Sequence, residues 1–503
     1  MSFGGPVYRL AERLQEVTGG ALEVALADPA FDPSARHDLR RASISRIAAL
    51  IHFAVAEDEN LLRAHRSTSL AWLLGDKQVA TTAPLGREDE YALHPLLAHH
   101  SAKFAAFICG FAAHLKQDRH QLIDAGLLDP DVGLVSGLKL DVGDVHEGGR
   151  SVLIGEFSSG QRLVYKPRPL DAEILLDRLA QELQRGDESS LVARRKVLSR
   201  YDHGWEEYVR HEELPSADDV HRYFRGFGHL VIVTAALGLV DAHCENLVAT
   251  ARGPCLVDAE CVLHPDVAPW PRPLPRGAEL VLRTGLLPVG PLFGAEFDAS
   301  ALAATAGEPF PVGTPSVRCI DNFQRITWTR PVLTGAKNQV RLNGKLLDGR
   351  RFASDIVAGA KAAHLAVKAG AGREELARTR SLPRRIIHRP SIFYKTLIEH
   401  SLSPAYFWDE ERREQLIKGV LEQQSLEDSG TERVELNAIS QGIIPTFRLH
   451  DLPGTSARDK AANTGAAFFD QISSTDFFTI EEALMGAINS SLSQSPSIEA
   501  KTA

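Results

Sequence analysis

Cysteine is scarce in this sequence, and a signal for export is missing. The 503 residues contain five cysteines, and no two of them have C-x-x-C spacing. So few and so scattered cysteines exclude a disulfide framework, and we expect reduced thiols. The N-terminus lacks the basic and apolar blocks of a signal peptide, and no apolar run has the length of a membrane span. Together these absences predict a cytoplasmic protein.

The sequence also lacks a large excess of charge of either sign. Its formal net charge is −9, and its 24% charged and 44% hydrophobic residues are ordinary for a soluble globular protein. This balance gives no support for a general nucleic-acid-binding protein, but it is compatible with a nucleotide that binds together with magnesium. The length corresponds to roughly two to four domains.

Hydrophobic periodicity and turn signals divide the chain into four regions. We expect a helical N-terminal cap over 1–125, a β-rich region over 126–215, a catalytic region over 216–376 and a helical region over 377–503. The helical spacing of the first region is clearest over 39–55, 60–74 and 96–115. Nothing in that region indicates catalysis, so we expect it to serve as a scaffold.

The β-rich region contains a predicted hairpin, whose strands 151–157 and 161–168 flank the turn Ser158-Ser-Gly160. Lys166 lies at the end of the second strand, where a compact cation on rigid backbone is suited to hold a nucleotide phosphate. A lysine on an exposed strand edge is the alternative. The pair Gly148-Gly149 before the hairpin would let the backbone approach a phosphate, although it lacks the G-x-G-x-x-G form.

An amphipathic helix is predicted to follow this hairpin over 171–183, with Asp171 as its N-cap. Glu173 and Glu182 both lie on it. Either glutamate could pair with Lys166, and the sequence does not distinguish between them.

The third region is organised around a polar loop that begins where an apolar helix over 223–240 ends. Asp241 and Asn246 lie five residues apart in this loop, and a short predicted hairpin then leads to Asp258 and Glu260. Protein kinases hold ATP with the same layout: the loop Asp accepts the proton of the substrate hydroxyl, while the Asn and the later Asp bind magnesium. An ordinary helix–hairpin corner with solvated carboxylates is the alternative.

Two stretches of the last region complete a set of five ordered motifs. The set is Gly143-Asp-Val-His146, Tyr165-Lys-Pro-Arg168, Asp241-Ala-His-Cys-Glu-Asn246, Arg385-Ile-Ile-His-Arg-Pro-Ser391 and Gly442-Ile-Ile-Pro-Thr-Phe447. In this order the motifs resemble the dehydratase domain of class II lanthipeptide synthetases (LanM type). Five motifs in the right order are far more specific than any one of them.

The resemblance implies an α+β fold with a two-lobed, kinase-like core, related to lipid and protein kinases, and additional helical elements at both ends. It also implies a two-step reaction that uses ATP and Mg²⁺. A Ser or Thr hydroxyl of a ribosomally made precursor peptide is phosphorylated, and elimination of phosphate then leaves dehydroalanine or dehydrobutyrine.

The resemblance assigns roles by position. Asp241 resembles the residue that aligns or deprotonates the hydroxyl, and His243 belongs to the same loop motif. The residues that resemble the nucleotide and magnesium ligands are Lys166, Asn246, Asp258 and Glu260. Those that resemble the elimination residues are Asp144, His146, Arg385 and Ser391. Elimination needs such groups because an arginine fork holds the phosphate dianion, a hydroxyl donates to it and a histidine moves the proton.

The sequence departs from the family pattern in two ways. Ser391 stands where the family usually has Thr, so the hydroxyl is retained but its rotamer is less restricted. The chain has no region with the zinc-binding Cys and His residues of a cyclase domain, so we expect a stand-alone dehydratase whose products are cyclised by a separate enzyme, if at all. Elements that recognise the leader peptide could be reduced or supplied by a partner.

Two other functions remain open on the sequence. One is a peptide or small-molecule kinase that phosphorylates without elimination. The other is a non-catalytic partner that binds nucleotide or leader peptide in a peptide-modifying complex. The presence of Asp241 together with Asn246, Asp258 and Lys166 counts against the second, because a binding module needs no proton acceptor.

Overall fold

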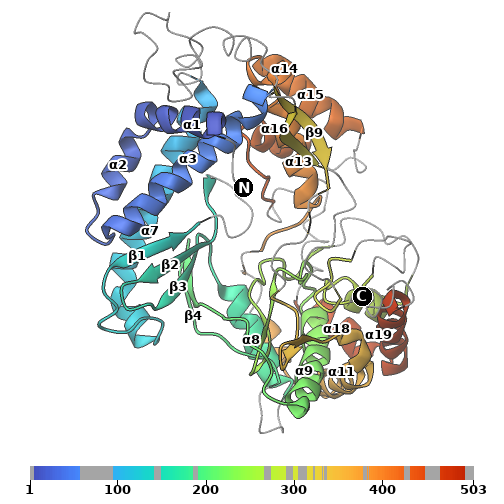
Figure 1. Ribbon diagram of the computed structural model, residues 1–503. Helices are drawn as coiled ribbons and strands as arrows, with labels where there is room; N and C mark the ends of the chain where they lie inside the picture. The colour runs from blue at the N-terminus through green and yellow to red at the C-terminus, as the bar shows by residue number, and fades with distance from the viewer. Residues whose placement is uncertain are drawn as a thin grey trace, which may run out of the picture.

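The fold mixes helices with antiparallel sheets and is mostly helical (Figure 1). It is known from a computed structural model that describes residues 5–56, 94–140, 149–184, 191–265, 274–289, 298–303, 314–320, 323–330, 332, 337–377, 382, 384–423, 431–447 and 465–492. Three features expected from the sequence lie outside these residues: the helix over 60–74, Gly148, and the pair Asp144 and His146.

The N-terminal helices cover one side of a sheet, as Figure 1 shows in blue. They are α1 (Gly5–Thr18), α2 (Gly20–Leu26), α3 (Pro33–Ala56) and α7 (Pro95–Asp124). By length and composition alone α7 qualifies as a membrane span, which the sequence analysis did not anticipate. Its buried face nevertheless packs against the sheet, in a core where Phe111 contacts the rings of Tyr165 and Trp205.

The sheet has five antiparallel strands in the order β1-β2-β3-β5-β4. Their bounds are β1 (Val135–Lys139), β2 (Leu153–Phe157), β3 (Arg162–Lys166), β4 (Val197–Ser199) and β5 (Gly204–Glu207). The predicted hairpin forms β2 and β3, in register Leu153 with Tyr165, and Gly160 takes the positive φ of 81° that its turn requires.

Helix α8 (Asp171–Glu182) connects β3 to β4. Its N-cap is Leu170, so the prediction for Asp171 is wrong. Asp171 is the first helical residue, and its carboxylate instead accepts a hydrogen bond from Ser199 at the end of β4 (2.9 Å). A tertiary contact therefore replaces the local cap.

A second group of helices packs around α9 (Ala217–Ala236) and α11 (Ala353–Lys368). Helix α9 ends four residues before the predicted residue 240, because Gly238 adopts φ 54° in a Schellman motif. In that motif the N–H groups of Gly238 and Leu239 donate to Ala235 and Thr234. The chain then enters the polar loop and the hairpin of β6 (Leu247–Thr250) and β7 (Gly253–Leu256).

The remaining short elements surround this group or continue the chain. They are α10 (Arg276–Leu282), β8 (Thr314–Ile320), β9 (Phe323–Thr329), β10 (Arg341–Leu342), β11 (Lys345–Leu346), η3 (Gly349–Phe352) and α12 (Arg373–Ala377). Strands β8 and β9 form one antiparallel hairpin, and β10 and β11 form another.

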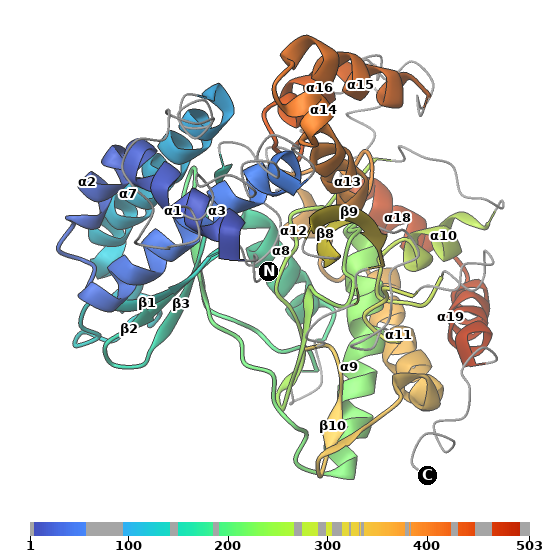
Figure 2. The same cartoon turned by 45° about the horizontal axis from the view of Figure 1, so that its top comes forward.

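The helices after residue 377 divide between two cores (Figure 2). Helices α18 (Gly465–Ser474) and α19 (Phe477–Leu492) pack with α9 and α11. In contrast, α13 (Ser391–Ser401), α14 (Pro404–Phe407), α15 (Glu410–Gln423) and α16 (Glu432–Ser440) share a core with α1 and α3. The helices after residue 377 therefore contribute to two separate cores.

Candidate functional site

The polar loop after α9 holds Asp241 in an unusual conformation. Its φ of 71° lies in the left-handed region, which is uncommon for residues other than glycine but tolerated by Asp and Asn. Asn246 stabilises the turn, because its Nδ2 donates to the Asp241 carbonyl oxygen (2.7 Å). The Asn246 carbonyl in turn accepts from the N–H of Val257 (2.8 Å), which joins the loop to the end of the hairpin.

The Asp241 carboxyl is both accessible and electrostatically perturbed. The side chain keeps 37% of its exposure, and its Oδ1 lies 3.5 Å from Nε2 of His243. Partial burial of this carboxyl raises the pKa of Asp241 to about 6, while His243 and Arg385 oppose that shift. A carboxylate with such a pKa is still ionised at neutral pH and can accept a proton.

Lys166 joins the sheet to this loop. Its Nζ donates to the Val257 carbonyl, directly before Asp258, and also lies 3.0 Å from Glu206 and 3.5 Å from Glu173. Burial disfavours the ammonium, but nearby carboxylates outweigh it and raise the pKa of Lys166 above its ordinary value. Of the two glutamates considered for this pairing, the structure therefore selects Glu173 and not Glu182.

Arg168 binds three carboxylates at once. Its Nη2 donates to Glu173 (2.6 Å) and to Oδ1 of Asp258 (2.6 Å), and its Nε lies 3.1 Å from Oε2 of Glu260. Burial opposes ionisation of Glu173, yet Arg168 and Lys166 hold the pKa of Glu173 below its ordinary value. Helix α8 and the segment after β7 are thus connected through one guanidinium group.

Arg385 approaches the same carboxylates from the C-terminal part of the chain. Its Nη1 donates to Oε1 of Glu260 (2.6 Å), and its backbone N–H donates to the Glu260 carbonyl (3.0 Å). The next two N–H groups are also held, since Ile386 donates to Phe447 O (2.9 Å) and Ile387 to Nε2 of His264 (2.9 Å). The motif that ends at Phe447 therefore positions the motif that begins at Arg385.

We call these linked charges the ionic network. Its members are Lys166, Arg168, Glu173, Glu206, Asp258, Glu260 and Arg385. Neither Arg168 nor Glu206 was predicted as a site residue from the sequence. Arg168 lay within a quoted motif, but its partners are far away in sequence. Glu206 gave no local signal, because it meets Lys166 only through the pairing of β3 with β5.

Of the four residues predicted for elimination, the structure describes only Ser391 and Arg385. Ser391 begins α13 after Pro390, and within the described part of the chain its hydroxyl makes no hydrogen bond. Asp144 and His146 lie outside the described residues. Of that group, only Arg385 is joined to the ionic network by contacts that the structure describes.

The oxygen atoms near the loop fit a magnesium-bound nucleotide in part. Carboxylate and amide oxygens are the ligands that Mg²⁺ takes from proteins. Asn246 uses its Nδ2 for Asp241, so Oδ1 is left for a cation, and Asp258 engages only Oδ1 among the described residues. Glu260 fits less well, because each of its carboxylate oxygens already pairs with an arginine.

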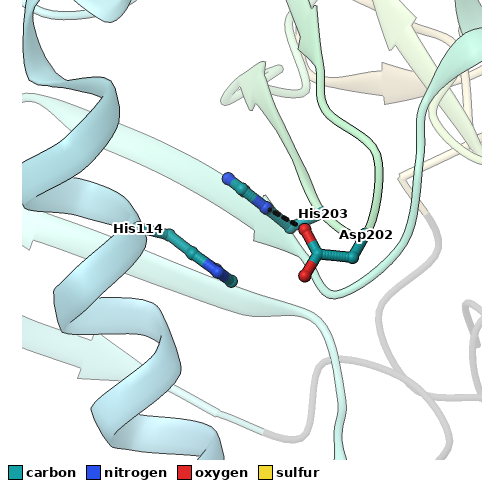
Figure 3. Close-up of side chains that lie close together, drawn as sticks. All are labelled: His114, Asp202 and His203. Carbon is teal, nitrogen blue, oxygen red and sulfur yellow. Dashed lines mark hydrogen bonds and ion pairs between the residues drawn. The ribbon is translucent and has the colours of Figure 1, made fainter.

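A second cluster of possible metal ligands lies between α7 and β5 (Figure 3). His114, Asp202 and His203 bring ligand atoms within 4.8 Å of one another. However, the two imidazole rings stack in parallel, 3.7 Å apart with an interplanar angle of 2°, so no ion can lie in both ring planes. Both nitrogens of His203 already bind carboxylates, from Asp202 (2.7 Å) and Asp118 (2.8 Å). The cluster is a hydrogen-bonded packing contact.

Comparison with known proteins places the loop and the ionic network inside a recognised domain. A family model described as Domain of unknown function (DUF4135) matches residues 92–450. The chain is also similar to the lacticin 481/lactococcin biosynthesis protein LcnDR2 of Lactococcus lactis subsp. lactis, with 25% identity over 189 residues. That alignment covers 35% of this chain and 20% of the relative, so the chain spans about one fifth of the relative's length.

Proposed function

The chain belongs to the DUF4135 family, and from this membership and the grouped charges we propose that it is an ATP-dependent dehydratase of a precursor peptide. It would convert Ser and Thr to dehydroalanine and dehydrobutyrine by phosphorylation and elimination. The observation that carries the proposal is that Val257, directly before Asp258, joins Lys166 to the Asp241 loop: its carbonyl accepts from Lys166, and its N–H donates to Asn246, whose amide holds Asp241. The relationship to a lacticin 481/lactococcin biosynthesis protein supports a ribosomal peptide as the substrate.

The arrangement supports a kinase-like core. In protein kinases a strand lysine pairs with a helix glutamate, and a loop Asp, an Asn and a later Asp complete the site. Lys166 of β3 lies 3.5 Å from Glu173 of α8, which matches the first pair. Asp241, Asn246 and Asp258 match the others in order.

In the first step the chain's own residues orient the hydroxyl and accept its proton. Asp241 accepts the proton as the Ser or Thr oxygen attacks the terminal phosphorus of ATP, and ADP leaves. Lys166 would hold the phosphates, and Asn246 and Asp258 would hold Mg²⁺. When bound, the magnesium ion neutralises phosphate charge and so favours transfer.

In the second step the Cα proton is removed, the Cβ–O bond breaks and phosphate departs, leaving the double bond. Arg385 would bind the phosphate, because a guanidinium group matches two phosphate oxygens. Ser391 would donate its hydroxyl to the leaving phosphate. Asp144 and His146 remain proposed for the proton transfer.

Mass spectrometry tests the proposal directly. The protein is incubated with ATP, Mg²⁺ and a precursor peptide from a neighbouring gene. Loss of water from the peptide supports the dehydratase, whereas a phosphate adduct alone supports a kinase without elimination. An unchanged peptide contradicts both and favours a non-catalytic partner in a peptide-modifying complex.

A matched pair of variants locates the chemistry. We expect Asp258→Asn to abolish phosphorylation, since it removes the charge that Mg²⁺ needs. Asp470→Asn makes the same change in α18, where Asp470 pairs at the surface with Arg373 as its one ionic partner among the described residues, and should leave activity intact. Phosphorylation by Asp258→Asn would show that the metal ligands are wrongly assigned.

A further inference from the structure

Glu260 has a set of partners unlike that of Asp258. Its Oε1 accepts from Arg385 (2.6 Å), its Oε2 lies 3.1 Å from Arg168, and its backbone carbonyl accepts from the Arg385 N–H (3.0 Å). Both carboxylate oxygens are therefore engaged by cations. Asp258, by contrast, uses only Oδ1 among the described residues. The two carboxylates of the D-x-E pattern are thus differently suited to a metal ion.

The two arginines that flank Glu260 differ in how many of their N–H donors already bind carboxylates. Arg168 is committed to Glu173, Asp258 and Glu260. The Arg385 side chain bonds only Glu260 among the described residues, so most of its N–H donors are left for an incoming anion. The N–H of Val240, directly before Asp241, donates to the carbonyl of Cys261, directly after Glu260 (3.1 Å), so the Asp241 loop lies beside the segment that Arg385 contacts.

We propose that Glu260 is a positioning residue that holds Arg385 beside the Asp241 loop to receive the phosphate of the phosphorylated peptide, and is not a third magnesium ligand. This inference rests on the proposed function and deepens it. Two guanidinium groups side by side repel each other, and the shared carboxylate between them offsets that repulsion. The phosphorylated residue could then undergo both steps at one place, because Glu260 holds Arg385 at the segment that lies beside the Asp241 loop.

The test separates metal binding from phosphate departure. Nucleotide binding is measured by calorimetry with ADP across a Mg²⁺ titration, for wild type, Glu260→Gln and Asp258→Asn. Phosphate release is measured separately with a synthetic phosphoserine form of the precursor. We expect Glu260→Gln to keep the wild-type Mg²⁺ dependence while Asp258→Asn loses it. Phosphate release by Glu260→Gln should fall by about a hundredfold, the order of loss that follows a misplaced group.

A double-mutant cycle adds a readout that a merely structural role would not give. If Glu260 acts through Arg385, then Glu260→Gln combined with Arg385→Ala releases phosphate no more slowly than Arg385→Ala alone. Thermal unfolding verifies that each variant folds, and Glu260→Asp, which keeps the charge but shortens the reach to both arginines, replaces Glu260→Gln if that variant does not. Glu260→Asp is expected to show the same selective loss of phosphate release.

The outcomes distinguish the two levels of the proposal. If Glu260→Gln weakens Mg²⁺-dependent binding as strongly as Asp258→Asn but releases phosphate at the wild-type rate, Glu260 is a metal ligand and the inference is wrong. If the wild-type protein neither phosphorylates the precursor nor releases phosphate from the phosphoserine peptide, the proposed function itself fails and the inference falls with it.

Discussion

Asp241 adopts a backbone conformation and a protonation equilibrium that are both unusual for aspartate. The left-handed φ of 71° turns the chain sharply between α9 and the hairpin. Such conformations cost free energy and are concentrated at functional sites, where the surrounding contacts maintain them. Here those contacts are the Asn246 amide and the hydrogen bond from the Ala242 N–H to Thr284.

The raised pKa of Asp241 predicts a pH dependence of phosphorylation. The carboxyl must be ionised to accept a proton, so the rate should fall as the pH drops through about 6. If the carboxyl had the usual aspartate pKa of about 4, the rate of phosphorylation would fall only near that pH. Initial rates of ADP formation across this range check the prediction, and a half-maximal rate near pH 4 would contradict it.

Replacement of Asp241 should separate activity from stability. An acid whose pKa is raised on folding contributes stability at low pH that is lost as the pH rises through about 6. At neutral pH the folded protein must hold this carboxyl in its charged form, which lowers stability, and Asp241→Asn removes that charge. Asparagine is also tolerated at positive φ. We therefore expect a slightly higher melting temperature at pH 7 together with a rate loss of about a hundredfold or more.

Ser391 and Arg385 should affect only the second step. We predict that Ser391→Ala and Arg385→Ala accumulate phosphorylated peptide while phosphorylation continues within a few-fold of wild type. Ser391→Thr is the matched control, because it keeps the hydroxyl and restricts its rotamer. Liquid chromatography with mass spectrometry resolves the two products. Complete dehydration by Ser391→Ala would remove Ser391 from the proposed site.

At the scale of elements, the crossing of α9 and α11 depends on glycine. A Cβ atom at Gly228 would overlap the Ile356 carbonyl oxygen, and one at Gly359 would overlap the Arg225 carbonyl oxygen. The two helix backbones are in direct contact there, with no room for a side chain. This packing matters for the site because the polar loop begins at the C-terminal end of α9.

A single methyl group at this crossing should therefore destabilise the protein. We expect Gly228→Ala to lower the free energy of unfolding by about 1–3 kcal/mol, the range for overpacking. Gly419→Ala in α15 is the control: nothing lies within 4 Å of its new methyl group, and alanine favours a helix by about 1 kcal/mol. Urea denaturation measures both. A neutral Gly228→Ala would mean that the helices separate easily.

At the scale of the whole molecule, the site lies where separate parts of the chain meet. Lys166 belongs to the sheet under the N-terminal helices, whereas Asp258 follows the hairpin packed with α9. Arg385 arrives from a segment just before α13, whose core includes residues of α1 and α3. Parts that are remote in sequence are thus joined through a few charged side chains.

A ligand bound at this junction should stabilise the whole fold. If ADP with Mg²⁺ bridges Lys166 and Asp258, a concentration of 100 times Kd adds about 2.7 kcal/mol to the free energy of unfolding. Thermal melts with ADP, with and without Mg²⁺, measure this effect. Asp258→Asn should lose the Mg²⁺-dependent part of the shift. An equal shift in that variant would place the metal elsewhere.

The sequence by itself determined the local elements and the residues of the motifs. The hairpins at 151–168 and 247–257 and the helix from residue 171 were predicted because periodicity and turn glycines act between neighbouring residues. The two-lobed, kinase-like arrangement and the division into four regions stay predictions. The early end of α9 at the Gly238 cap could have been predicted from the same kind of local signal.

Only the tertiary structure decided which charges meet. It selected Glu173 over Glu182, gave Arg168 its partners and placed Glu260 between two arginines. Arg168 and Asp258 lie 90 residues apart, and Arg385 and Glu260 lie 125 apart. Ion pairs at such separations leave no periodic trace in the sequence, because they depend on how whole elements pack and not on the conformation of adjacent residues.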